Sequence, residues 1–244
     1  MNVSEFIQQS AREKRTLFSV LIDPDKYSFD SLDRIMDLSV RAGVDLFFFG
    51  GSLLLRDQQE EMISRVKSAC KIPVVLFPGN NFQVTDKADA LLFLSLVSGR
   101  NPEFLIGKHV VAAPYLKATG MEVIPTGYLL IDGGSPTTVE YMSNTRPIPS
   151  AKNEIAVCTA LAGEFLGMDL IYMDAGSGAK NPVPEGMIRA VKENISVPLI
   201  IGGGITSPEQ AQRVAHSGAD VVVVGNILEK QPDLVLHLSQ IIHQ

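Results

Sequence analysis

Short apolar runs recur along the chain, and amphipathic segments lie between them. The runs are almost continuously apolar, as in parallel strands that are buried on both faces. About eight such runs are present, at residues 17–22, 45–49, 74–77, 90–94, 128–131, 170–173, 199–201 and 221–224. The pattern therefore predicts a sheet of parallel strands.

Helix signals fill most of the gaps between these runs. Residues 31–42 form an amphipathic pattern, and Gly43 follows as a C-terminal cap. Ser207 and Pro208 begin a second clear helix, because serine caps a helix N-terminus and proline fits its first turn. Strands and helices that alternate through short links form right-handed βαβ units. Eight such units predict an α/β fold, a closed (β/α)8 TIM barrel rather than an open doubly wound sheet.

Two gaps depart from this rhythm. Residues 78–88 are too few for an ordinary crossover helix, so we expect an irregular link in place of the third helix. Residues 132–151 are rich in Gly, Ser, Thr and Pro, and so long a loop in a compact domain is typical of a functional lid or of disorder. No linker or charge run divides the chain, so residues 1–244 are expected to form a single domain.

The composition argues against several classes of protein. Apolar residues make up 45% of the chain and charged residues 20%, as in ordinary globular proteins. The net charge of −6 argues against a nucleic-acid partner, which requires a clustered basic face. The two cysteines lack a metal-like spacing, and the apolar stretches are too short to span a bilayer. We expect a cytoplasmic protein without a signal peptide or transmembrane segment.

Glycines follow the last three predicted strands, where a barrel of this type carries its site. They stand at 176, 178, 202–204 and 225. Without a Cβ, these positions free main-chain N–H groups that can bind phosphate without any lysine or arginine. Glycines also occur in ordinary tight turns. Two glycine-rich turns after the seventh and eighth strands nevertheless favour a phosphate site.

Acidic residues follow the first and sixth predicted strands. Asp23, together with Ser52 after the second strand, is suited to hold one Mg²⁺, which needs few protein oxygens when water and phosphate complete its shell. The alternative is that Asp23, Pro24 and Asp25 form only a turn. Asp174 and Tyr172 project to the same side of their strand. Asp174 is placed either to orient or deprotonate a substrate hydroxyl, or to anchor its loop.

Five segments together resemble the geranylgeranylglyceryl phosphate synthases and the related heptaprenylglyceryl phosphate synthases. They read LIDPDK, FFFGGS, YMDAGSGA, IIGGGI and VVGN, in this order and at predicted strand ends. The last two are common to phosphate-binding barrels, whereas the first three are more specific. The resemblance extends from Leu17 to Asn226 and implies an ether-forming prenyltransferase.

The resemblance implies two substrates, one cofactor and a set of site residues. Glycerol-1-phosphate would supply its free primary hydroxyl, and a long polyprenyl diphosphate, geranylgeranyl diphosphate foremost, would be the electrophile. Mg²⁺, held by Asp23 and Ser52, would assist the departure of diphosphate, with Asp174 and Tyr172 as the catalytic residues. The implied glycerol phosphate site comprises Tyr172, Met173, Asp174, Ala175, Gly176, Ser177, Gly178, Gly203, Gly204, Gly225 and Asn226.

This chain departs from the family pattern at two positions. Leu21 stands where some members carry a lysine, and Asp174 stands where the usual acid is the longer Glu. A long tail also needs an apolar groove. The candidate wall residues are Phe47, Phe49, Phe93, Leu94 and Tyr115, each of which also suits an ordinary core. Residues near Tyr141, Arg146 and Lys152 are placed to close over the diphosphate and exclude water.

Two alternatives remain open at this point. One is another phosphate-binding barrel enzyme, such as a sugar-phosphate isomerase or lyase, which usually needs an acid–base pair or a Schiff-base lysine at a strand end. The other is a non-catalytic protein that binds a phospholipid precursor. We also expect a homo-oligomer, and a transient contact with the membrane surface for product release.

Overall fold

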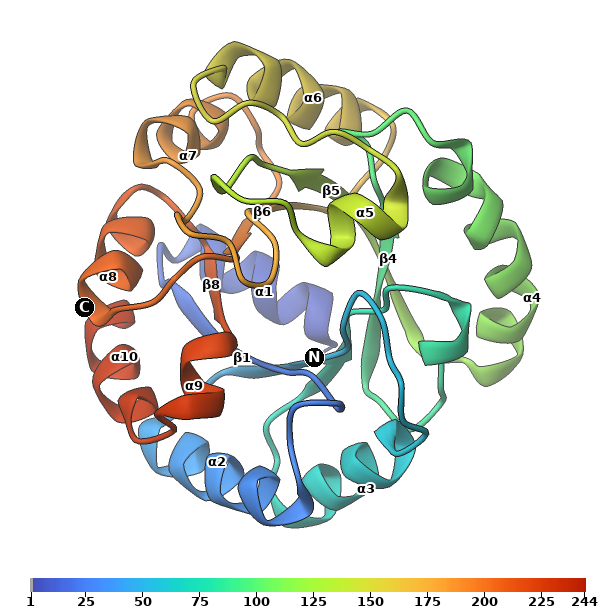
Figure 1. Cartoon of the computed structure of the whole chain (residues 1–244), viewed down its shortest axis with the longest axis vertical. Helices are drawn as coiled ribbons and strands as arrows, with labels where there is room; N and C mark the ends of the chain where they lie inside the picture. The colour runs from blue at the N-terminus through green and yellow to red at the C-terminus, as the bar shows by residue number, and fades with distance from the viewer. Residues whose placement is uncertain (1) are drawn as a thin grey trace.

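Eight parallel strands close into a barrel in the order of the sequence, as the computed structural model of residues 2–244 shows (Figure 1). The closed barrel confirms the predicted fold class. The strands are β1 (Leu17–Ile22), β2 (Leu46–Phe49), β3 (Val74–Leu76), β4 (Ala90–Ser95), β5 (Glu122–Leu130), β6 (Leu170–Asp174), β7 (Leu199–Gly202) and β8 (Val221–Val224).

Helices surround the strands as an outer ring (Figure 1). The ring contains α2 (Phe29–Ala42), α3 (Gln59–Ala69), α4 (Lys108–Thr119), α6 (Asn153–Phe165), α7 (Glu185–Lys192), α8 (Pro208–His216) and α10 (Leu234–Ile242). Two helices carry the predicted end signals. Gly43 ends α2 in the left-handed conformation, and the Ser207 side chain caps α8 by accepting the N–H of Gln210.

Side chains alternate between the two sides of each strand. Within β2, Phe48 packs inside the barrel, whereas Phe47 and Phe49 pack outward against the helices. Likewise Tyr172 of β6 points inward and Met173 points outward. The strands are apolar on both faces because they bury one face in the barrel and the other beneath the helices.

Strand β5 is longer than the apolar run that predicts it. It begins at Glu122, six residues before the predicted start, because Pro125, Thr126 and Gly127 interrupt the apolar pattern without interrupting the strand. Glu122 also fixes α1 (Val3–Arg12), whose first N–H groups, on Val3 and Ser4, donate to its carboxylate at 2.7 and 2.8 Å. Helix α1 thereby covers the amino end of the barrel.

An irregular link replaces the third helix, as the short gap predicts. Between β3 and β4 the chain forms a 3-10 turn (Asn81–Gln83), so the ring is open between α3 and α4 (Figure 1). The buried Gln83 side chain holds this link in place. Its amide nitrogen donates to the Gly51 carbonyl at 2.8 Å, and its amide oxygen accepts the N–H of Gly79 at 3.2 Å. Gln83 therefore joins the loops that follow β2 and β3.

The long segment at residues 132–151 is ordered and contains α5 (Thr138–Ser143). A bridge between Ile131 and Ile148 returns its far end to the barrel. In Figure 1, α5 lies over the barrel near the ends of β4, β5 and β6. Of the two expectations for this segment, the structure therefore favours a cover over the barrel mouth.

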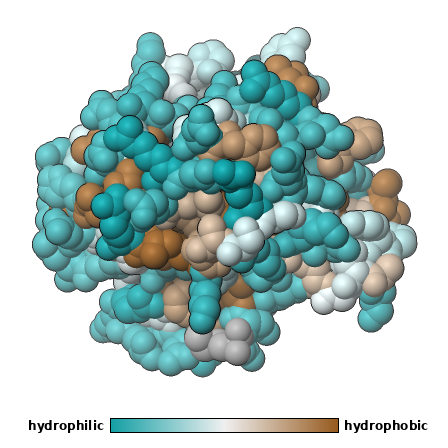
Figure 2. All heavy atoms as spheres, turned by 90° about the horizontal axis from the view of Figure 1, so that it is seen from below, coloured by the Kyte–Doolittle hydropathy of each residue, from teal (hydrophilic) through white to brown (hydrophobic). Residues whose placement is uncertain are grey.

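The surface seen from the side of α2 and α3 is mainly hydrophilic, with smaller separate hydrophobic patches (Figure 2). None of the helices within residues 2–244 is both long and apolar enough to cross a membrane. Both cysteines, Cys70 and Cys158, are free thiols.

Candidate active site

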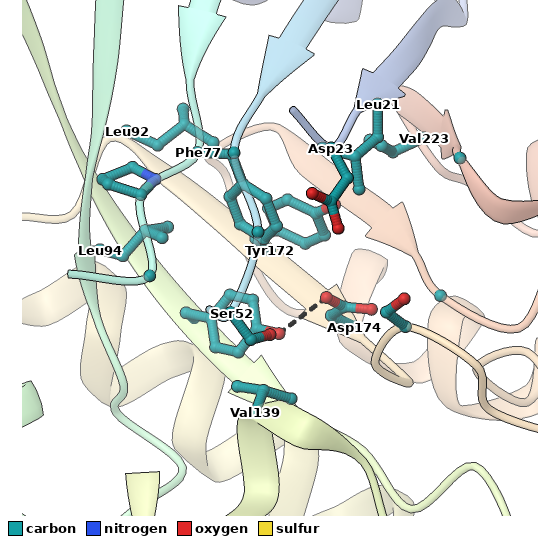
Figure 3. A pocket seen from close by; sticks show the side chains of 18 of the residues that line it. Leu21, Asp23, Ser52, Phe77, Leu92, Leu94, Val139, Tyr172, Asp174 and Val223 are labelled. Atoms are coloured by element: carbon teal, nitrogen blue, oxygen red, sulfur yellow. Dashed lines mark hydrogen bonds between the residues drawn. The ribbon is translucent and has the colours of Figure 1, made fainter. Parts of the chain in front are cut away.

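A cavity opens at the carboxyl ends of the strands and collects most of the predicted site residues (Figure 3). Asp23 enters it from the end of β1, and Tyr172 and Asp174 enter it from β6. The predicted residues that line the cavity are Asp23, Ser52, Tyr172, Asp174, Ser177, Gly178, Gly203, Gly204, Gly225 and Asn226. Positions spread over two hundred residues of sequence are thus brought to one place.

Three predicted residues do not line the cavity. Met173 and Ala175 are buried in the outer core between strands and helices, because they alternate with Tyr172 and Asp174 along the chain. Gly176 uses its N–H to bond Asp174 Oδ1 at 2.7 Å, so this amide is engaged by its own loop. Met173 therefore belongs to the core outside β6, whereas Ala175 and Gly176 belong to the packing of the loop that follows it.

Main-chain amides without partners lie in two neighbouring loops that line the cavity. Within residues 2–244, the N–H groups of Ser177, Gly178, Gly203 and Gly204 have no hydrogen-bond partner. The loops after β6 and β8 are joined by the Ser177 hydroxyl, which donates to Asn226 Oδ1 at 3.1 Å. Buried or half-buried amides need a partner, so unpaired amides beside a cavity are suited to bind an anion.

Gly203 shows why glycine is needed at this surface. Its φ is +76°, a left-handed conformation that L side chains rarely adopt. A Cβ there would lie 2.2 Å from Asp174 Oδ1 and 2.5 Å from the Gly176 nitrogen. Gly203 therefore allows the loops after β6 and β7 to approach each other closely.

Asp174 is a buried carboxyl group with two hydrogen-bond donors. The Tyr128 hydroxyl donates to its Oδ2 at 2.7 Å, and the Gly176 N–H donates to its Oδ1. Burial is the largest influence and raises the pKa of Asp174, while the two hydrogen bonds partly oppose that rise. A carboxylate with a raised pKa beside a cavity is suited to accept a proton. Asp174 also orders its own loop, so the two roles expected for it are compatible.

The Asp23 carboxylate lies against the neighbouring loop, and only one of its oxygens accepts a hydrogen bond within the described residues. Its Oδ1 accepts the N–H of Asp25 at 3.0 Å, and the whole carboxylate lies against Gly51, where a Cβ would be 3.1 Å from Oδ2 and 3.3 Å from Oδ1. Burial is the main cause that raises the pKa of Asp23. Asp25 instead anchors the next loop, because its carboxylate accepts the N–H groups of Leu55 and Arg56.

An apolar groove continues from the cavity behind β4, where the ring lacks a helix. Its walls come from the outer face of β4, the irregular link and the inner face of α4. The wall residues are Val84, Leu91, Phe93, Ala112 and Leu116. His109 also lies there, buried edge-on against Phe93 with ring centroids 4.5 Å apart, and its Nε2 lies 3.1 Å from the Ser95 hydroxyl.

The predicted wall residues are partly wrong. Phe93 and Leu94 line the cavity, but Phe47 and Phe49 pack outward beneath the helices, and Tyr115 lies on the outer side of α4. The apolar run at β2 could not reveal which of its residues face the barrel. The side-chain alternation decides this, since a shift of one position exchanges the two faces.

The cover over the cavity is apolar rather than basic. Val139 and Met142 of α5 line the cavity. Arg146 instead lies in a separate polar depression beside Arg100, and Lys152 pairs with Glu154 at 3.6 Å on the surface. The expected closure by Arg146 and Lys152 is therefore not what the structure shows, and α5 acts by covering the site with hydrocarbon.

Three further residues belong to the site although the sequence did not single them out. Tyr128 holds Asp174, Glu229 enters the cavity from α9 (Asn226–Lys230), and Lys108 enters it from α4. Burial, followed by the charge of Asp23, raises the pKa of Glu229. The sequence could have indicated Tyr128, because it places a hydroxyl group at an inward position of a strand. Nothing local distinguishes Glu229 or Lys108 from surface residues of a helix.

Comparison with known proteins identifies close relatives over nearly the whole chain. The sequence profile of the PcrB family matches residues 9–242. A geranylgeranylglyceryl phosphate synthase of Chitinophaga pinensis is 50% identical over 240 residues, covering 98% of this chain and 95% of the relative. One from Pyrococcus horikoshii is 41% identical over 233 residues, covering 95% of this chain and 91% of the relative.

Solved structures of similar proteins also match nearly the whole chain. The crystal structure of (S)-3-O-geranylgeranylglyceryl phosphate synthase from Thermoplasma acidophilum, in complex with sn-glycerol-1-phosphate, matches with a TM-score of 0.93. It is 34% identical and covers all of this chain and 99% of that one. The tryptophan synthase alpha chain of Legionella pneumophila matches with a TM-score of 0.61 at 17% identity, and shares the fold alone.

Replacing Tyr128 by Phe should raise the pKa of Asp174 further, because the lost hydrogen bond stabilised the ionised carboxylate. Titration of the labelled carboxyl carbon by NMR measures this change. We also expect the free energy of unfolding to fall by about 1–3 kcal/mol, since a buried partner is left unsatisfied. Tyr141→Phe, on an exposed side chain, is the control. An unchanged or lower pKa in Tyr128→Phe would contradict the role given to this hydroxyl.

Proposed function

Because this chain belongs to the PcrB family, we propose that it joins sn-glycerol-1-phosphate to a long-chain prenyl diphosphate through an ether bond. The observation that carries the proposal is the division of one cavity into two chemically different parts. Free amides and Asp174 lie at the barrel mouth, and an apolar groove leads away behind β4. A phosphorylated glycerol and a hydrocarbon tail would fit side by side in such a cavity.

The amides of the loops after β6 and β7 would hold the phosphate of sn-glycerol-1-phosphate. Ser177, Gly178, Gly203 and Gly204 offer N–H groups there, which supply hydrogen bonds without adding a charged side chain. Such hydrogen bonds would compensate for the lysine that some family members carry where this chain has Leu21. The free primary hydroxyl of the glycerol would then point toward Asp174.

The reaction exchanges one carbon–oxygen bond for another. The glycerol hydroxyl oxygen bonds the first carbon of the prenyl chain, and the bond from that carbon to the diphosphate oxygen breaks. Its electron pair leaves with the diphosphate, and the hydroxyl proton passes to the Asp174 carboxylate. Val139 and Met142 cover the mouth with apolar groups, which keeps out water that would compete for the same carbon.

The geometry does not favour a sugar-phosphate isomerase or lyase. Among residues 2–244, Lys108 is the only lysine or arginine that lines the cavity, and it comes from α4 rather than from a strand end. A Schiff-base lysine of the usual placement is thus missing from the described part of the chain. An apolar groove of this extent also has no use in binding a small sugar phosphate.

The residues present suit a magnesium ion. The Asp23 carboxylate lies against Gly51, and Ser52, the next residue, lines the same cavity, so two oxygen ligands would come from neighbouring loops. The described residues contain no cluster of three or more His, Cys, Asp or Glu side chains for a metal. That is compatible with Mg²⁺, which keeps several waters and shares phosphate oxygens. When bound, the ion would neutralise charge on the departing diphosphate.

The outer face of α4 and the turn that leads into it are apolar, and we propose that this face contacts a second copy of the chain. Ile106, Val110, Val111 and Tyr115 are all exposed there, while the inner face of the same helix lines the groove. A helix that is apolar on both sides is normally covered on both sides. A membrane surface is the alternative partner for this face.

The proposed function is tested by incubating the protein with sn-glycerol-1-phosphate, geranylgeranyl diphosphate and MgCl₂. We expect an ether product and an equal amount of released diphosphate. Asp174→Asn should lower turnover by about 100-fold or more, because the proton acceptor is lost. Turnover of a sugar phosphate in place of ether formation would overturn the proposal. Substrate binding without turnover, unchanged by Asp23→Asn, would favour a non-catalytic binding protein instead.

Ser52→Ala should weaken Mn²⁺ binding, followed by electron paramagnetic resonance with Mn²⁺ as a substitute for Mg²⁺. It should leave the affinity for sn-glycerol-1-phosphate within about twofold, because that ligand lies at the other loops. Asp23→Asn should weaken Mn²⁺ binding more, because it removes the charged ligand. Equal losses of Mn²⁺ and glycerol phosphate binding in Ser52→Ala would show that the serine supports the fold of the site and not the ion.

Val111→Asp should reduce the molar mass measured by light scattering to that of a monomer, because it places a charge in the proposed contact. Val40→Asp is the matched control, since Val40 is an exposed valine on α2. A wild-type protein that is already monomeric would rule out the proposal. Loss of binding to lipid vesicles in Val111→Asp would then assign the face to a membrane.

A further inference from the structure

The charges around the cavity are unbalanced. Three carboxyl groups line it, those of Asp23, Asp174 and Glu229, and they come from three separate elements. Within the described chain, Lys108 supplies the one permanently charged cationic side chain of the lining. His109 lies beside it, but burial lowers the pKa of its imidazole, which favours the neutral form. A ligand with several negative charges therefore meets only one fixed cation here.

Lys108 stands where the two parts of the cavity meet. Its Nζ lies 4.1 Å from the centre of the Phe104 ring, and Phe104 packs against the inner barrel cluster together with Leu94 and Val139. Its carbonyl accepts the Asn81 side chain at 3.2 Å, which ties the start of α4 to the irregular link. The backbone of Lys108 thus belongs to the groove wall, while its ammonium group reaches toward the barrel mouth.

The position matches the place where a prenyl diphosphate must carry its charge. Its first carbon has to reach the glycerol hydroxyl beside Asp174, and its tail has to lie in the groove behind β4. The diphosphate is attached to that first carbon, so it lies at the junction of mouth and groove. Lys108 is the cationic side chain at this junction.

We propose that Lys108 binds the diphosphate of the prenyl substrate and stabilises it as it leaves. This inference rests on the proposed function, and it names a residue for the part of the substrate that Asp23 and Ser52 would hold only through a metal ion. Lys108 is half-buried, so its ammonium group is partly withdrawn from water and interacts more strongly with an anion than a surface lysine does.

The contact with Phe104 explains how the ammonium group is kept available. A cation over an aromatic face is held in a defined position, but the attraction is weaker than a charge-assisted hydrogen bond to a phosphate oxygen. The flexible side chain of lysine can therefore exchange the ring for the diphosphate by rotating its end groups. As the carbon–oxygen bond breaks, the diphosphate gains one negative charge, and the lysine interacts with it most strongly at that stage.

Binding of inorganic diphosphate in the presence of MgCl₂, measured by isothermal titration calorimetry, tests the inference without relying on turnover. Lys108→Met should weaken this binding by about tenfold or more, because a charge-assisted hydrogen bond is lost. Lys108→Arg should restore most of it. Binding of sn-glycerol-1-phosphate should stay within about twofold in every variant, since its amides lie in other loops.

Lys117 provides the matched control, because it is an exposed lysine on the same helix that does not line the cavity. Lys117→Met should bind diphosphate as the wild type does. Lys108→Gln serves as a second neutral variant, so that the result does not depend on one protein folding well. Prenyl transfer should show the loss in both kcat and the KM for prenyl diphosphate, with the KM for glycerol phosphate unchanged.

The outcomes separate this inference from the proposed function. If Lys108→Met and Lys108→Gln bind diphosphate as Lys117→Met does, the inference is wrong, whether or not the wild type forms an ether. If they lose affinity for both ligands equally, Lys108 supports the structure of the site and the inference is also wrong. A wild type that binds diphosphate through Lys108 but forms no ether would instead overturn the proposed function alone.

Discussion

The carboxyl groups that line the cavity set the main electrostatic constraint on this protein. In the proposed reaction, two anionic substrates must meet in a space lined by the carboxyl groups of Asp23, Asp174 and Glu229. Repulsion between like charges is strong where water is scarce, so every anion needs a compensating partner. The fold provides such partners from three sources: main-chain amides, oxygen ligands for a metal ion, and the ammonium group of Lys108. Each stands at a different part of the cavity.

The missing helix between β3 and β4 leaves the space that the apolar groove of the cavity occupies. An ordinary helix between β3 and β4 would bury Leu91 and Phe93 beneath its own side chains. The irregular link leaves them free to form a groove, and the buried Gln83 gives the link the rigidity that a helix would otherwise supply. The same omission brings Lys108 to the edge of the mouth, because α4 becomes the next wall. A single local shortening of the chain thus separates the apolar part of the site from the polar part.

The sequence predicts the barrel and the phosphate loops because both depend on local patterns. Apolar runs at strand length and glycines directly after them require no knowledge of distant contacts, and Gly203 has the conformation that only glycine accepts readily. The roles of residues that depend on side-chain direction were harder to predict from the sequence. Phe47 and Phe49 turn outward because Phe48 turns inward, and the register of β2 against its neighbours decides which. Glu229 and Lys108 reach the cavity only through the packing of α9 and α4, which no short motif records.

The two phosphorylated groups would be held by different means because their charges behave differently during the reaction. The phosphate of glycerol phosphate takes no part in bond breaking, so its charge is constant, and neutral amides of Gly203, Gly204 and their neighbours suffice to hold it. The diphosphate gains charge as it departs. An interaction lowers the activation barrier only if it is stronger in the transition state than in the complex with the substrate. As the diphosphate gains charge, its attraction to a full positive charge increases more than its attraction to an amide dipole. An ion at Asp23 and Ser52 and the ammonium group of Lys108 would therefore stand at the leaving group, while the amides stand at the group that stays.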